Sequence, residues 1–418
     1  MAPRVSLDAV LDPAAARVVL TRDADGTLTD AAFDLAGLPR VDALLAGRPV
    51  ADVPALVERL CSICPAAHHL AGVRALEALA GGVTIPPAAE AVRRLLHHAS
   101  VVAMHVVGFF AADPADAACL RRFAKAGMAA AGSPGHFPAT AIPGGVTATV
   151  VPAARDDCLG ALPDALAAAR RLAERTVGEA RTDAFDGADV ALVDAAGRLD
   201  LFGSRLRAVA ADGTVVIDGA SPQEWDDLVV EAVPGSPAPR PYLVALGADR
   251  GAYRVGPVAQ LRIGPVATPL AAAAQAAWRR DGGGAAAARA IVVLHAVEVI
   301  AGLLGEADRF AGPSAVPVRE GAGSSIGVGW VDGARGLLVH RYEVGMDGVL
   351  SRATILTPTA QNEPWLGELL RAAATGEPAT DRLEEAIREA DPCLPCSTAP
   401  AGTMGLVVDT VRPSRKEP

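Results

Sequence analysis

Residues 58–69 read Glu-Arg-Leu-Cys-Ser-Ile-Cys-Pro-Ala-Ala-His-His, and their Cys-x-x-Cys pair decides the fold. A second pair stands near the other end of the chain, in the Asp-Pro-Cys-Leu-Pro-Cys of residues 391–396. A loop of this spacing lets two sulfur atoms converge on one metal ion at about 2.3 Å, and a helix that follows points amide donors at the thiolates. The pairs Cys61/Cys64 and Cys393/Cys396 therefore predict one thiolate-bound metal centre that both ends of the fold close.

Spacing alone leaves the metal open. A structural zinc site of four cysteines is one alternative, although zinc ribbons usually separate their pairs by roughly fifteen to twenty residues. An iron-sulfur cluster is another, although such clusters commonly draw most of their thiolates from one local run. A redox metal and zinc remain equally compatible with the four positions.

Length and charge exclude several classes of protein. The chain has 418 residues, half of them apolar, and a formal charge of −10, so it can bury one large core or two fused ones. Its acidic balance argues against nucleic acid and an anionic membrane surface as partners. No N-terminal apolar run suits a secretory signal, and the most apolar later stretch, 288–304, carries charged residues. We expect a cytoplasmic protein without a membrane span, in which Cys119 and Cys158 are buried thiols.

Local patterns indicate the elements. Three Asp-Gly pairs predict tight hairpin turns, and apolar residues at three- and four-residue spacing predict helices. The hairpins are expected over 17–30, 205–218 and 337–357, and the helices over 54–80, 87–110, 158–183 and 270–304. The fold class is therefore α+β and predominantly helical, with a central helix bundle and small peripheral antiparallel sheets.

The two cysteine motifs resemble the end motifs of the large subunit of nickel-iron hydrogenases. They read Arg59-x-Cys61-x-x-Cys64-x-x-x-His68 and Asp391-Pro392-Cys393-x-x-Cys396. Intervening segments resemble the same family in the same order, at 85–90, 142–146, 253–257, 294–298, 334–336 and 357–362. The likeness covers nearly the whole chain, implies the large-subunit fold, and is closest to the cytoplasmic, NAD- or NADP-coupled multisubunit branch.

The resemblance implies a nickel-iron centre. Cys61 and Cys393 would be terminal ligands of nickel, while Cys64 and Cys396 would bridge nickel to an iron that carries carbonyl and cyanide ligands. Thiolates are soft donors that suit such metals. The implied reaction is reversible heterolytic cleavage of dihydrogen, with the sulfur of Cys393 as the favoured proton acceptor.

The resemblance also assigns residues around the metals. Arg335 matches the family's arginine over the open site, either as a base or, because a guanidinium keeps its proton, as a charged hydrogen-bond partner. Thr359, beside Pro358, would donate to a cyanide, and His68 would donate toward a bridging sulfur. Asp391 would pair with Arg335 or cap the next turn. We expect only core roles for His69, His97, His98 and His295.

The chain departs from the family pattern near both ends. Ala14 stands where the family has a glutamate that passes protons away from nickel. Ala399 stands where it has a histidine that helps to bind a magnesium or iron ion and marks the cut of a maturation endopeptidase. Asp42 matches an acidic ligand of that second metal, so the magnesium site is incomplete. We divide the chain into a catalytic domain, 1–399, and a C-terminal extension, 400–418, which is either removed on maturation or kept.

The resemblance implies partners. After the four ligands only two cysteines remain, so electrons must leave through an iron-sulfur small subunit. Diaphorase subunits would bind NAD(P), because no Gly-x-Gly-x-x-Gly follows a predicted strand here. We expect the catalytic large subunit of a nickel-iron hydrogenase. The alternative is a diverged, non-catalytic structural or assembly subunit with zinc on the four cysteines; Ala14 and Ala399 favour it, whereas Arg335 and Thr359 oppose it. A quinone-site relative would generally lack the four cysteines.

Overall fold

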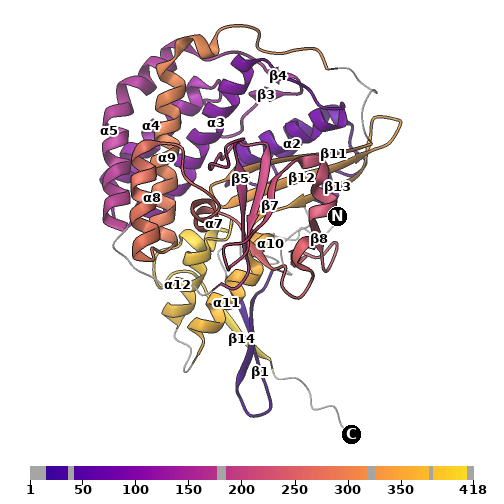
Figure 1. The fold of residues 1–418 in the computed structure, drawn as a ribbon, viewed down its shortest axis with the longest axis vertical. Coiled ribbons are helices and arrows are strands. Elements are labelled where there is room, and N and C mark those ends of the chain that lie inside the picture. Colours follow the sequence, from indigo (N-terminus) through magenta and orange to yellow (C-terminus); the bar gives the residue numbers. More distant parts are fainter. Residues whose placement is uncertain (1–15, 36–41, 177–184, 319–324, 376–379, 412–418) are drawn as a thin grey trace, which may run out of the picture.

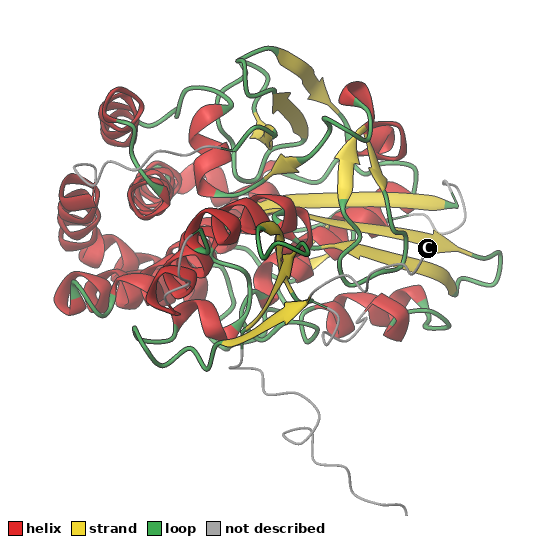
Figure 2. Ribbon diagram, turned by 90° about the horizontal axis from the view of Figure 1, so that it is seen from below, coloured by secondary structure: helices red, strands yellow, loops and turns green. Residues whose placement is uncertain are grey.

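The computed structural model describes residues 16–35, 42–176, 185–318, 325–375 and 380–411. Its long helices gather on one side of the molecule and most of its strands on the other, as Figure 1 and the perpendicular view of Figure 2 both show. The largest apolar core lies among the helices, and smaller cores lie between the sheets and α2.

The helix bundle is built around α9, which is apolar on every side and therefore buried. It packs against α3, α5 and α8, and α4 packs against α3 and α5. Several helices begin with proline at their first position, where the missing amide proton costs nothing. The helices are α1 (Val53–Val57), α2 (Pro65–Leu79), α3 (Pro87–His105), α4 (Pro114–Ala130), α5 (Pro152–Thr176), α6 (Trp225–Leu228), α7 (Pro257–Arg262), α8 (Pro269–Asp281), α9 (Ala285–Gly305), α10 (Pro358–Gln361), α11 (Glu363–Ala373) and α12 (Thr380–Ala390).

Helix α9 is also the one described helix that is long and apolar enough to cross a membrane. Of its apolar window, 72% is buried inside the fold, against the neighbouring helices. Its composition is therefore accounted for by its place in the core.

The strands form five small sheets in the described part of the chain. Their orders are β14-β1-β2, β10-β5-β6-β7, β11-β12-β13, β3-β4 and β8-β9. The strands are β1 (Arg17–Arg22), β2 (Leu28–Phe33), β3 (Ala141–Ile142), β4 (Gly145–Val146), β5 (Ala188–Val193), β6 (Arg205–Val209), β7 (Val215–Ala220), β8 (Val229–Glu231), β9 (Pro241–Leu243), β10 (Tyr253–Arg254), β11 (Ile326–Gly333), β12 (Gly336–Val344), β13 (Leu350–Leu356) and β14 (Val407–Val411).

The predicted fold class and all three hairpins are confirmed: β1-β2, β6-β7 and β12-β13 turn at the Asp-Gly pairs. Two pairings, β1 with β14 and β10 with β5, are parallel and were not predicted. Two predicted helices are interrupted. The first breaks at the Cys61–Cys64 loop, and the last breaks at 282–284, where Gly282 adopts the left-handed conformation that ends α8.

Two features of this fold bring the cysteine pairs together. Helix α2 lies across β11 and β12, so its N-terminal end reaches the turn between these strands. Strand β14 pairs with β1, which draws the segment after the second cysteine pair back to the N-terminal hairpin.

Candidate metal centre

The first cysteine pair lies in the loop between α1 and α2. Cys64 is the residue before Pro65, which opens α2, and the carbonyl oxygen of Cys64 accepts a hydrogen bond from the amide of His68. Cys61 precedes it in the same loop. The proline fixes the backbone at the helix start, and the free amides of the first turn favour negative charge on a nearby sulfur.

In the second pair, Cys393 lies between α12 and the 3-10 turn Pro395–Thr398, and Cys396 lies within that turn. Asp391 holds a left-handed conformation, with φ of 46°, directly after α12. The amide of Cys393 donates to Oγ1 of Thr359 on α10 over 2.8 Å. The structure therefore places Thr359 against the backbone of a cysteine, a contact that the sequence did not predict, and leaves its hydroxyl proton free to donate elsewhere.

Three of the four sulfur atoms converge. The Sγ atom of Cys393 lies 3.9 Å from that of Cys61 and 3.7 Å from that of Cys64. Cys396 is 1% exposed and belongs to the main apolar core, and none of the described hydrogen bonds joins its sulfur to the other three. The structure therefore brings the sulfurs of Cys61, Cys64 and Cys393 together. Cys396 is buried in the apolar core, three residues after Cys393 in the chain.

The converging sulfurs share their protons unevenly. Hydrogen bonds with Cys393 and then Cys64 lower the pKa of Cys61, against the effect of burial. Hydrogen bonds with Cys393 and Cys61 raise the pKa of Cys64, and the hydrogen bond with Cys61 raises the pKa of Cys393 to about 12. Burial raises the pKa of Cys396 to about 11. A metal cation that bound these sulfurs would lower the pKa of each and draw their protons off.

Arg335 stands at the two-residue turn between β11 and β12. Nη2 of Arg335 donates to Oδ1 of Asp391 over 3.3 Å, and Arg335 is 8% exposed. Burial lowers the pKa of Arg335, but Asp391, Cys393 and Cys64 raise it by more, so the guanidinium stays charged beside the sulfurs. The turn needs Gly336, whose φ is 120° and whose Cβ would lie 2.5 Å from the amide nitrogen of Gly256.

His68 lies on the first turn of α2, facing the sulfurs. One of its ring nitrogens lies within 4.8 Å of the sulfurs of Cys61 and Cys64. Its Nδ1 lies 3.0 Å from Nε2 of His340 on β12. Sequence reasoning missed His340 and Tyr342; the available signal was two polar side chains at alternate positions of an expected strand.

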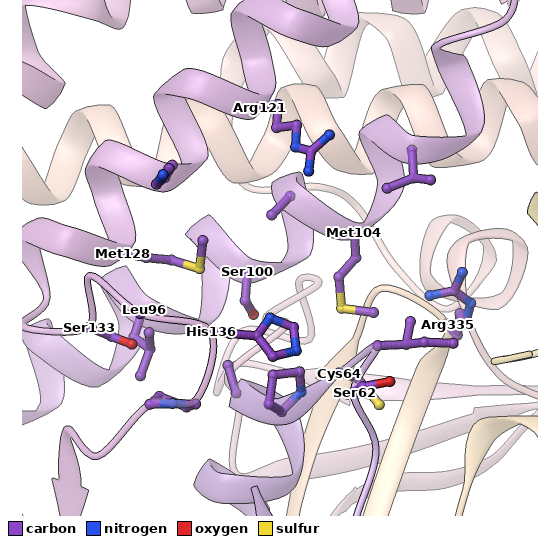
Figure 3. A pocket seen from close by; sticks show the side chains of 18 of the residues that line it. Ser62, Cys64, Leu96, Ser100, Met104, Arg121, Met128, Ser133, His136 and Arg335 are labelled. Carbon is purple, nitrogen blue, oxygen red and sulfur yellow. The ribbon is translucent and has the colours of Figure 1, made fainter. Parts of the chain in front are cut away.

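A cavity of about 640 Å³ opens beside the site, between α3, α4 and the segment 133–138. Cys64 and Arg335 stand at its edge, while Met104, Ser100 and His136 point into it in Figure 3. The lining is mostly apolar, so a small apolar molecule could reach the sulfurs from this side.

Several predicted residues take other places. Ala14 lies outside the described residues, and the structure describes only the backbone of Asp42, which begins a 3-10 turn. The carbonyl oxygen of Ala399 accepts hydrogen bonds from Arg388. Pro358 opens α10 directly before Thr359.

The remaining predicted histidines have the expected core roles. All four are buried, and each shares a hydrogen bond with a backbone or hydroxyl group. The contacts are His69 with Ala141, His97 with Asp332, His98 with Arg94 and His295 with Thr268. Cys158 is buried as predicted, whereas Cys119 is only partly buried.

Comparisons with known proteins give a consistent family. A family model described as nickel-dependent hydrogenase matches residues 40–131. The chain is 27% identical over 458 residues to the beta subunit of the NAD-reducing hydrogenase HoxS of Cupriavidus necator, in a match that covers 94% of this chain and 93% of that one. It is 29% identical over 402 residues to one subunit of the F420-non-reducing hydrogenase vhu of Methanocaldococcus jannaschii, with coverage of 86% and 95%.

Solved structures agree. A NAD+-reducing NiFe hydrogenase in the H2-reduced state matches with a TM-score of 0.76 and 30% identity, over 90% of this chain and 95% of that one. The Ni-Fe-Se hydrogenase of D. vulgaris Hildenborough matches with a TM-score of 0.64 at 17% identity over 89% and 94%, which supports the fold.

Proposed function

The chain belongs to the nickel-dependent hydrogenases, and from that premise we propose that it is the large subunit in which dihydrogen is cleaved heterolytically and reversibly. The observation that carries this proposal is the convergence of the sulfurs of Cys61, Cys64 and Cys393 beside a buried, charged Arg335. These three thiols come from both ends of the chain, and a shared metal centre accounts for their meeting.

The residues fit nickel and iron, the metals of this family. Thiolates are soft ligands for such metals, and a cluster of thiols this close together needs cations to become fully deprotonated. Cys61, Cys64, Cys393 and Cys396 would hold the two metals, which supply the site at which dihydrogen is polarised and its electrons are accepted. Carbonyl and cyanide ligands on iron belong to this proposal, with Thr359 and Pro358 beside them. So does a magnesium ion at Asp42.

The chain's own groups divide the remaining tasks. The Sγ atom of Cys393 would take the proton, because it lies near both other sulfurs and has Arg335 nearby to balance its charge. Arg335 would act as a fixed positive charge and hydrogen-bond donor, since its pKa is raised and Asp391 holds it in place. The cavity, whose lining is mostly apolar but includes Arg121 and Lys125, would admit dihydrogen.

Electrons must leave through a partner. Beyond the four ligands the sequence holds only Cys119 and Cys158, too few for an iron-sulfur cluster. An iron-sulfur small subunit is therefore part of the proposal, and the similarity to a NAD-reducing hydrogenase supports diaphorase partners that bind NAD(P). We place the complex in the cytoplasm.

The test is to purify the chain together with its small subunit, and to measure nickel, iron and zinc, infrared absorption of metal-bound carbonyl and cyanide, and hydrogen-dependent dye reduction. We expect stoichiometric nickel, bands of both diatomic ligands, and activity. Cys393→Ala should abolish the activity, and Cys119→Ala, which changes a partly buried thiol on α4, should retain it. Zinc or no metal, with a silent infrared window, would overturn the proposal in favour of a structural or assembly role.

A further inference from the structure

Three buried side chains form a hydrogen-bonded chain behind the cysteine sulfurs. Nδ1 of His68 lies 3.0 Å from Nε2 of His340, and Nδ1 of His340 lies 2.5 Å from the hydroxyl oxygen of Tyr342. Both ring pairs meet edge to face, with centroids 5.1 Å and 5.7 Å apart. His340 and Tyr342 are fully buried, and His68 is 3% exposed. Water therefore does not compete for these contacts.

The fold is shaped for this chain. His340 and Tyr342 are two residues apart on β12, so both side chains point to the same face, which packs against α2. Helix α2 leaves room for the hydroxyl at Gly72, where a Cβ atom would lie 3.1 Å from the oxygen of Tyr342 and 2.9 Å from Val57. A larger residue at position 72 would therefore displace the hydroxyl of Tyr342.

The hydroxyl of Tyr342 sets the direction of the first hydrogen bond. Burial raises the pKa of Tyr342 well above its usual value, so the phenol keeps its proton. His340 is the one hydrogen-bond partner of that hydroxyl in the described part of the chain. If His340 donated, the phenolic proton would be buried without an acceptor, which costs more than an unused lone pair. The hydroxyl therefore donates to Nδ1 of His340.

The second hydrogen bond follows from the first. Burial lowers the pKa of His340 well below its usual value, so its ring is neutral and carries one proton. Because Nδ1 accepts from Tyr342, that proton is on Nε2, which donates to Nδ1 of His68. Because Nδ1 of His68 accepts this hydrogen bond, its ring proton is on Nε2, the nitrogen left to face the sulfurs. If both hydrogen bonds ran in the opposite direction, Nε2 of a neutral His68 ring would present a lone pair to the sulfurs instead of a proton.

We propose that Tyr342 and His340 are positioning residues that fix the tautomer of His68, so that its Nε2–H is held as a hydrogen-bond donor to the sulfurs of Cys61 and Cys64. The inference rests on the proposed function only for the role of these sulfurs as metal ligands. A hydrogen-bond donor held against a ligand sulfur draws electron density from that sulfur. Because His340 and Tyr342 fix the tautomer of His68, this withdrawal of electron density stays constant.

The first test uses the metal-free chain labelled with 15N-histidine, because nitrogen chemical shifts separate protonated from unprotonated ring nitrogens. The chain has eight histidines, and single His→Gln variants assign them. We expect His68 and His340 to carry their protons on Nε2 alone. Tyr342→Phe should give both tautomers at His68. A wild-type His68 protonated on Nδ1, or a Tyr342→Phe chain with an unchanged tautomer, would overturn the proposal.

Three further variants separate this role from a merely structural one. Tyr253→Phe removes another fully buried hydroxyl, which donates to Gln361, and should leave His68 unchanged. His340→Gln keeps an acceptor and a donor in place and should retain the Nε2–H tautomer of His68. Gly72→Ala should displace the hydroxyl and reproduce the effect of Tyr342→Phe, which provides a second variant if that protein does not fold.

The second test uses the metal-loaded complex with its small subunit. In Tyr342→Phe the carbonyl infrared band should move to lower wavenumber, because the sulfur that has lost its donor returns electron density to iron. An unmoved band would also overturn the proposal. A wild-type complex without any such band would instead contradict the proposed function, and the nitrogen spectra of the metal-free chain would still decide the tautomer.

Discussion

The Sγ atoms of Cys61 and Cys393 lie 3.9 Å apart, although 332 residues separate them in the chain. Cys64 lies 3.7 Å from the same sulfur of Cys393. Partly buried thiols at this distance do not all ionise without a cation, because like charges in a medium of reduced polarity repel strongly. The cluster therefore favours binding of cations, and its state of ionisation should report whether metal is present.

Alkylation of Cys61 should depend on pH less steeply than alkylation of Cys119. The thiolate is the reactive form, and hydrogen bonds from Cys393 and Cys64 lower the pKa of Cys61, whereas burial raises that of Cys119. As pH falls from the alkaline range to neutrality, Cys61 should remain ionised while Cys119 becomes protonated. Mass spectrometry of peptides from the metal-free chain measures both rates. Metal loading should protect Cys61 and leave Cys119 unaffected; parallel pH profiles would contradict this assignment.

Arg335→Lys should lower hydrogen-dependent dye reduction by roughly 100-fold, the scale of losing one preorganised charged donor at a reacting centre. Lysine keeps the charge but cannot reproduce the contact of Nη2 with Asp391, so the loss isolates geometry from charge. Asp391→Asn should have a smaller effect, because the charge of Arg335 remains. Nickel content is measured in each variant, and unchanged activity in Arg335→Lys at full nickel content would remove this residue from the mechanism.

The sequence predicted the parts of this molecule that depend on local chemistry. Asp25-Gly26, Asp212-Gly213 and Asp347-Gly348 indicate turns because few other residue pairs adopt the required backbone, and the structure turns at each of them. The cysteine pairs indicated one centre because two half-sites need each other, and three sulfurs meet.

The parts that escaped prediction depend on long-range pairing. Nothing local indicates that Val407–Val411 joins Arg17–Arg22 as a parallel strand, since parallel pairing has no hairpin signal. His340 and Tyr342 resemble ordinary strand residues until α2 is placed over them. The contact of Thr359 with the amide of Cys393 likewise exists only once α10 meets the second cysteine loop.

Glu77→Gln should lower the free energy of unfolding by about 3 kcal/mol or more, because it leaves the buried guanidinium of Arg93 without its counter-charge. The two carboxylate oxygens of Glu77 accept from Nη1 and Nη2 of Arg93 at 3.0 Å and 2.7 Å, and Oε1 also accepts from the amide of Gly144. Denaturant unfolding of the purified chain measures the change. Glu174→Gln, which breaks the exposed pair with Arg170, should cost less than about 1 kcal/mol. Equal costs would contradict the burial argument.

The segment after the second cysteine pair is built into the fold. Met404 is fully buried, and the amide of Gly402 donates to Glu384. Strand β14 pairs with β1 along its whole length, and Arg17 forms an ion pair of 2.9 Å with Asp409. Arg388 donates to the carbonyl oxygens of Ala399 and Pro400, on both sides of the expected cut. A protease would have to undo these contacts before it reached the bond.

Residues 400–411 should therefore remain in the purified complex, and their removal should destabilise the chain. Met404→Ala should cost about 2–5 kcal/mol, the range for emptying a buried site of this size. Val408→Ala, at an exposed position on β14, should cost less than about 1 kcal/mol. Intact-mass spectrometry of the nickel-loaded complex tests retention directly, and denaturant unfolding tests the two substitutions. If the large subunit of the active complex had the mass of a chain ending at Ala399, the strand would be released on maturation. If Met404→Ala lowered the free energy of unfolding by less than about 1 kcal/mol, the buried Met404 side chain would contribute little to stability.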